Sequence, residues 1–193
     1  LEANATVPQV CERITEAICQ TTEFPFVGLF TKASHSKEEL VLFGWSGKDW
    51  IGRDISLIIR RPVHLDLTDE WLSRPETRRL ISVEEMHPKD FAQFVDYPVE
   101  SITRVLKKLP LKTIYQVKLV VRRRLVGVLV VGYYSPADQI RQEDTLLIDR
   151  LSESIGVALD NKLLFEENKH VLRQLRDTNA KLRALDEAKD DFV

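Results

Sequence analysis

The 193-residue sequence has little cysteine, no basic excess and no long apolar run, and each shortage excludes a class of protein. Its formal charge of −2 lacks the positive excess that a dedicated nucleic-acid binder concentrates on one face. The longest apolar run, Leu125–Tyr134, has ten residues, whereas a membrane helix needs about twenty. No basic segment followed by an apolar stretch opens the chain, so the sequence predicts no export signal.

The two cysteines predict a reducing location and no disulfide. Cys11 and Cys19 lie eight residues apart in one predicted helix. This spacing is about 12 Å along the helix axis, beyond the reach of a disulfide within that helix. We therefore expect two small buried side chains in a cytoplasmic protein.

The sequence also lacks the patterns of a catalytic or metal centre. It has no glycine-rich phosphate loop and no nucleophile motif, which predicts no catalytic residue. Four histidines are scattered singly, without metal-ligand spacing, so we predict no metal site: His35, His64, His87 and His170. Haem ligation by His64 or His87 stays open as a minor alternative.

The first half of the chain predicts a helix followed by a strand hairpin. Residues 6–20 have Thr6 as an N-cap, a proline in the first turn and one apolar stripe. The stripe consists of Val7, Val10, Cys11, Ile14, Ala17 and Ile18. Residues 26–31 and 39–45 should pair as a hairpin. The segment 48–109 is mixed: 55–59 is apolar, 63–67 alternates like a strand, 69–80 could be helical and 98–109 predicts a helix.

The second half predicts another hairpin and then a long helix. Residues 114–121 and 125–134 are rich in β-branched side chains, and the later run is apolar on both faces, as in a strand at the sheet's interior. The triplet Arg122–Arg124 forms the tip, which we interpret as solvated rather than as a phosphate contact. From about Gln142 onward, helix-forming residues continue to the end of the chain.

The end of this helix has the spacing of a coiled coil. Its inward positions, most of them apolar, recur at alternating steps of four and three, and 14 of the 33 residues from Asn161 to Val193 are charged. The predicted dimer seam is Leu164, Val171, Leu175, Leu182, Leu185 and Phe192, with Asn168, Thr178 and Lys189 as inward polar positions. The upstream stripe at Leu151, Ile155 and Ala158 is one position out of step with the seam. We therefore expect the helix to exchange the sheet for a second chain near Asn161.

The order of these elements resembles the GAF sensory domain. The most similar stretch runs from Leu109-Pro110-Leu111 to Tyr134 and continues with Asp144 to Leu159. The resemblance implies an α+β fold, with an antiparallel sheet flanked by helices, a sensory domain over 1–160 and a C-terminal helix forming a parallel coiled coil over 161–193.

A second resemblance concerns the end of the chain. The segment Leu182–Val193 is similar to the entry into the dimerisation helix of bacterial sensor histidine kinases, where a phospho-accepting histidine follows within a few residues. This resemblance implies a kinase cut before its catalytic parts, with ATP bound only in the missing part and a response regulator as partner. None of the four histidines has the family's context.

Other activities of GAF-like proteins find little support in the residues. Residues 20–193 contain no cysteine, which argues against methionine sulfoxide reduction and against covalent bilin attachment. A cyclic-nucleotide signature is not recognisable. A pocket between the sheet and the middle segment would be the family's ligand position, and its candidate lining residues are Phe43, Trp45, Trp50, Trp71 and Tyr115.

The sequence thus predicts a cytoplasmic, homodimeric input module of a two-component histidine kinase. The identity and the existence of a ligand stay open, because the aromatic residues could equally fill a core. The alternatives are a ligand-free structural dimerisation module and a GAF input to another output domain, such as a diguanylate cyclase.

Overall fold

The computed structural model of the chain describes residues 5–32, 39–48, 63–66, 70–86, 100 and 110–190. Its elements are α1 (Val7–Thr21), β1 (Phe26–Lys32), β2 (Glu39–Gly47), β3 (His64–Asp66), α3 (Glu70–Ser73), β4 (Arg78–Ser82), β5 (Thr113–Val121), β6 (Arg124–Tyr133), a 3-10 turn (Ala137–Gln139) and α6 (Gln142–Asp190). The predicted α+β class, with an antiparallel sheet, flanking helices and a long C-terminal helix, is confirmed. Among the described helices, none is both long and apolar enough to cross a bilayer.

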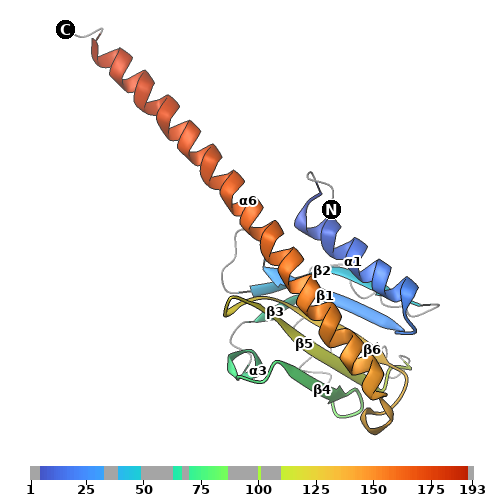
Figure 1. Cartoon of the computed structure of the whole chain (residues 1–193). Helices are drawn as coiled ribbons and strands as arrows, with labels where there is room; N and C mark the ends of the chain where they lie inside the picture. Colours follow the sequence, from blue (N-terminus) through green and yellow to red (C-terminus); the bar gives the residue numbers. More distant parts are fainter. Residues whose placement is uncertain are drawn as a thin grey trace.

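The described strands form one antiparallel sheet in the order β3-β2-β1-β6-β5-β4. Both predicted hairpins, β1–β2 and β5–β6, are confirmed. Strand β6 lies between β1 and β5, and its last eight residues are all buried, which explains why its sequence is apolar on both faces. Figure 1 shows α1 and α6 lying on the same face of this sheet.

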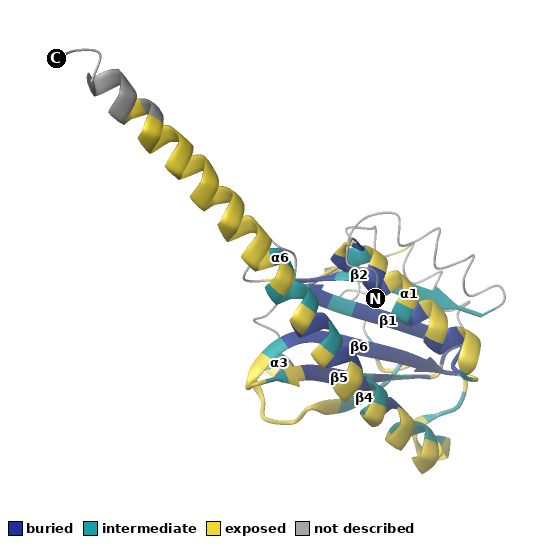
Figure 2. Cartoon of the chain, turned by 45° about the horizontal axis from the view of Figure 1, so that its top comes forward, coloured by how far each residue is buried: buried dark blue, intermediate teal, exposed yellow. Residues whose placement is uncertain are grey.

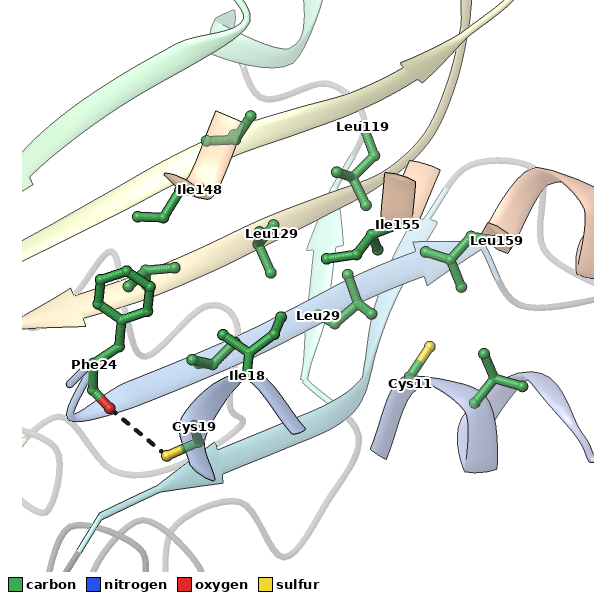
Figure 3. Close-up of a cluster of buried hydrophobic side chains, with 14 of the residues drawn as sticks. Cys11, Ile18, Cys19, Phe24, Leu29, Leu119, Leu129, Ile148, Ile155 and Leu159 are labelled. Atoms are coloured by element: carbon green, nitrogen blue, oxygen red, sulfur yellow. Dashed lines mark hydrogen bonds between the residues drawn. The ribbon is translucent and has the colours of Figure 1, made fainter. Parts of the chain in front are cut away.

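A helix-side core fills the space between the sheet and these two helices (Figure 3). It contains fully buried side chains from α1, β1, β6 and α6, among them Val10, Leu29, Leu129 and Leu159. Both cysteines are free and buried in this core, as the sequence predicts. Burial and the neighbouring Glu12 raise the pKa of Cys11 to about 12, so its thiol stays protonated at neutral pH.

Helix α1 differs from its predicted stripe at one edge. Ala17 is exposed, whereas Thr15 and Cys19 are buried beside Cys11 and Ile18. Thr15 can be buried because its hydroxyl donates to the carbonyl oxygens of Cys11 and Glu12, at 3.1 and 3.0 Å. Because threonine is a polar residue, the sequence pattern does not indicate that Thr15 belongs to the buried face.

The prediction of one helix over 69–80 was wrong. Helix α3 ends at Ser73, just before Pro75, and Arg78–Ser82 forms the strand β4 at the edge of the sheet. The proline explains the end of the helix, because the residue before a proline is pushed out of helical geometry. The predicted segments 55–59 and 98–109 lie outside the described residues, apart from residue 100.

The arginine triplet divides between the turn and the strand. Arg122 and Arg123 form the two-residue loop, with left-handed φ angles of 50° and 64°. Positive φ at both positions matches the twist that a tight hairpin requires. Arg124 begins β6 and pairs with Asp160 on α6 instead of standing free in solvent. The prediction of a wholly solvated tip therefore holds for two of the three arginines.

Candidate functional site

The sheet has a second face, opposite α1 and α6, to which the middle segment contributes Trp71. Two apolar clusters lie on it and share the half-buried Phe26 and Ile114. We call them the far-face clusters. Their buried members are Leu40, Trp71, Val128 and Val130 in one, and Val83 and Leu111 in the other.

The four predicted pocket residues that the structure describes do not lie together. Trp71 and Trp45 belong to the two far-face clusters, whereas Phe43 and Tyr115 pack into the helix-side core. Trp50 lies outside the described residues. Phe43 and Tyr115 therefore fill the core beneath the helices, and Trp45 and Trp71 are the two of the set that face the predicted pocket side.

Cations flank Trp71 on the far face. The guanidinium carbon of Arg79 lies 4.3 Å from the ring centroid, and Lys118 Nζ lies 4.8 Å from it. Lys118 is buried and donates to the Arg74 carbonyl oxygen at 2.6 Å, while Arg79 Nε donates to Gln116 Oε1 at 2.5 Å. Trp71, Arg79 and Lys118, which we call the Trp71 stack, connect α3 to β4 and β5. Cations and an indole ring are side chains that can bind an anionic or aromatic group.

Sequence reasoning missed this stack. Its cations are far apart in the chain, and they were interpreted as ordinary members of a helix and of a strand. One signal was available: Gln116 and Lys118 alternate with apolar residues in an otherwise apolar run, which marks a strand face that carries polar side chains. Only the pairing of β4 with β5 brings Arg79 opposite Gln116.

No metal centre appears among the residues that the structure describes, where no group of three or more ligating side chains comes together. His64 lies on the edge strand, with Nδ1 2.8 Å from Glu39 Oε2 on the neighbouring strand, and His170 is exposed on α6. His35 and His87 lie outside the described residues.

Two ion pairs connect α6 to the sheet. Asp149 Oδ2 lies 2.8 Å from Arg78 Nη1 on β4, and its other oxygen accepts a hydrogen bond from the Tyr115 hydroxyl at 3.3 Å. Burial, together with the charge of Asp149, raises the pKa of Tyr115, so the hydroxyl stays a donor. Eleven residues further along α6, Asp160 Oδ1 pairs with Arg124 Nη2 at 2.5 Å.

Helix α6 is one unbroken helix of 49 residues, and it continues past these contacts (Figures 1 and 2). Leu163 is its last residue packed against the helix-side core, and every side chain described from Glu167 onward is exposed. The predicted seam lies here: Leu164 is half-buried, and Val171, Leu175, Leu182 and Leu185 are between 54% and 68% exposed. Phe192 lies outside the described residues.

No protein-family profile matches the sequence, and no curated protein is significantly similar to it. Solved structures are similar in fold. A GAF domain/HD domain protein from Geobacter sulfurreducens has a TM-score of 0.55 at 12% identity, over 82% of this chain and 94% of that one. The GAF domain of an Acinetobacter phosphoenolpyruvate-protein phosphotransferase has a TM-score of 0.50 at 12% identity, over 82% and 85%.

A bacteriophytochrome from the photosynthetic bacterium R. palustris is also similar, with a TM-score of 0.53 at 12% identity. It matches 93% of this chain, and this chain covers 38% of its length. At identities this low, the similarity shows the fold alone. The long helix on the antiparallel sheet, the first helix beside it and these neighbours together show that the chain has the fold of a GAF domain.

Proposed function

We propose that the chain is the sensory input and dimerisation module of a two-component histidine kinase. Residues 1–160 would form the sensory domain, and residues 161–193 the signalling helix. The observation that carries this proposal is the continuity of α6, which packs on the sheet at its start and runs on, without a break, as an exposed heptad-patterned helix.

The contacts of α6 with the sheet suit a relay. Core residues and the two ion pairs hold its first half to β4, β5 and β6. A signal with different affinities for two packings of the sheet would shift the balance between them. Because the helix is continuous, a rotation or a shift of its first half would reach the far end.

The exposed leucines support pairing of two chains. A lone helix with Leu175, Leu182 and Leu185 in solvent loses the burial that these side chains could provide. A second copy with the same heptad spacing would cover them in a coiled coil. The polar positions Asn168 and Thr178 would keep this coil weak enough to be shifted.

The similarity of Leu182–Val193 to histidine-kinase dimerisation segments supports the output. The parent protein would transfer phosphate from ATP to a histidine beyond this chain, and from there to a response regulator. The kinase would work in the cytoplasm, which suits the free, buried thiols of Cys11 and Cys19. We expect no covalent bilin, since residues 20–193 contain no cysteine to carry one.

A ligand-free dimerisation module is the second candidate, and the separation of the predicted pocket residues favours it. Phe43 and Tyr115 fill the helix-side core and leave Trp45 and Trp71 on the far face. Native mass spectrometry of the purified chain separates the two functions. A retained small molecule, with a raised melting temperature on its re-addition, supports sensing, whereas a ligand-free mass supports spacing.

The output is tested on the parent protein. Incubation with radiolabelled ATP should give an acid-labile, alkali-stable phosphoryl group, the signature of phosphohistidine. A parent that instead makes a cyclic dinucleotide, and incorporates no phosphate, would contradict the histidine-kinase assignment.

A further inference from the structure

Helix α6 has two faces where it lies on the sheet, and both follow one heptad frame. With Asn161 taken as position a, the residues packed on the helix-side core fall at b, c, e and f. They are Ile148, Leu151, Ile155, Leu159 and Leu163, and the buried Ser152 also lies at f. The sheet therefore occupies the side of the helix that a coiled coil leaves outward.

The a and d positions of the same segment point away from the sheet. Val157, at d, is 51% exposed, although it lies between the buried Ile155 and Leu159. In the same frame Leu164 and Val171 are the next d residues, and Leu175 is an a residue. The seam of the exposed half thus continues, without a change of register, onto the part of α6 that the sheet holds.

Two consecutive a positions carry asparagine, Asn161 and Asn168, and both are exposed. An asparagine at a specifies register and two-strandedness, because it pairs with its own copy across a parallel, in-register dimer. In the same frame Ser154 occupies the a position before Val157, and Arg150 occupies the d position before that. In a parallel dimer the two copies of Arg150 would bring like charges together. Leu147, at an earlier a position, is also exposed, but Arg150 and Ser154 separate it from the later seam. The continuous seam therefore begins at Val157.

We propose that a second copy of this chain packs its α6 in parallel and in register, and that this interface begins at Val157, inside the GAF-fold domain. This inference rests on the proposed dimer and deepens it. Residues 157–163 then touch their own sheet with one side and the partner helix with the other. They form the segment in which the domain and the coil share a helix.

The Arg124–Asp160 ion pair belongs to this segment. Asp160 occupies position g, at the flank of the seam, and it lies between the sheet-facing Leu159 and the seam residue Asn161. Arg124 is the first residue of β6, directly after the β5–β6 turn. A movement of this hairpin would therefore act directly on the flank of the first layers of the interface.

Disulfide trapping of variants that each add one cysteine to the chain tests the inference. Val157→Cys and Val171→Cys make the same chemical change at two d positions, about 21 Å apart along the helix. Arg173→Cys, at the outward position f, is the matched control, and the parent chain controls for the buried Cys11 and Cys19. Mild oxidation should convert the 22.3-kDa band of both valine variants into a dimer band, and leave the other two unchanged.

The pattern of bands separates this inference from the proposed function. A dimer band from Val171→Cys without one from Val157→Cys overturns the early start of the interface and leaves the paired signalling helices standing. No dimer band from either variant overturns both. Antiparallel pairing would give a dimer band from one of the two valine variants at most. An equally strong band from Arg173→Cys would show random collision of chains instead of a seam. Either result contradicts the inference.

Discussion

At the scale of single residues, Asp160 holds the last sheet-bound turns of α6. Its side chain is 5% exposed and its partner Arg124 is 44% exposed, so the two members of the pair are unequal. Removing the arginine leaves a buried carboxylate without its partner charge. Neutralising the carboxylate instead leaves an arginine that can turn to water.

We therefore expect Arg124→Ala to cost more stability than Asp160→Asn. The first change should lower the free energy of unfolding by about 2–3 kcal/mol, less than a fully buried charge without its partner costs, because the pair is partly solvated. The second should cost about 1 kcal/mol. Urea unfolding followed by circular dichroism measures both, and equal losses would contradict this description of the pair.

The thiol of Cys11 makes a second prediction at this scale. Burial raises its pKa from 9.0 to about 12, so the folded state disfavours the thiolate. The resulting stability is complete below pH 9 and is lost as the pH rises toward 12. Between pH 9 and 11 the unmutated chain should lose stability more steeply than the Cys11→Ala variant, in which the other titrating groups are unchanged. Parallel curves for the two proteins would refute the assignment.

The sequence predicted single residues well where one helix or strand decides their position. Cys11 and Cys19 were expected to be buried because both lie on one helix. The partner of Asp160 could not be predicted, because Arg124 lies 36 positions earlier and only the packing of α6 across β6 brings them together. The Trp71 stack depends in the same way on the pairing of β4 with β5.

At the scale of elements, α1 approaches β2 so closely that one position requires glycine. A Cβ at Gly44 would lie 2.3 Å from the backbone carbon and oxygen of Cys11. Backbone atoms cannot turn aside as a side chain does, so the helix itself would have to move.

Gly44→Ala should therefore lower the free energy of unfolding by about 3 kcal/mol, at the upper end of the cost of overpacking. Gly28→Ala is the control on the neighbouring strand, because the nearest atoms to its added Cβ are ends of side chains at 3.3 Å. We expect a loss of less than about 1 kcal/mol there. Chemical unfolding compares them, and similar losses would show that the helix can move at little cost.

The elements show where local pattern is sufficient. Both hairpins, α1 and α6 carry strong periodicity, and all four were predicted from it. Strand β4 was missed because Arg78–Ser82 has a single β-branched residue and lies at the edge of the described sheet, where it pairs with β5. Long-range pairing, which no window of sequence contains, makes this segment a strand.

The exposed half of α6 gives the prediction for the proposed dimer. Aspartate at both Leu175 and Leu182 would bury unpaired charge in the seam, at about 3 kcal/mol for each layer. Together the two layers lower the affinity of the dimer about ten-thousandfold. Sedimentation velocity at micromolar concentration should show a monomer. Ala180→Asp, at an outward position, should leave the dimer intact, and a double variant that still dimerises would place the interface elsewhere.

At the scale of the whole molecule, α6 is shared between a domain and a projecting rod. The sheet holds it as far as Leu163, and the described part then continues to Asp190 without a contact to the domain core (Figure 2). Residues 1–160 and 161–193 remain our proposed division. The fold could be predicted from sequence because helix and strand periods are local, whereas the make-up of the far face depends on packing between distant segments.

The central claim is that two copies pair through α6, and the molar mass in solution tests it most directly. Light scattering on the purified 193-residue chain should give twice the protomer mass of 22.3 kDa at micromolar concentration. A mass of one protomer, unchanged as the concentration rises, would contradict the account.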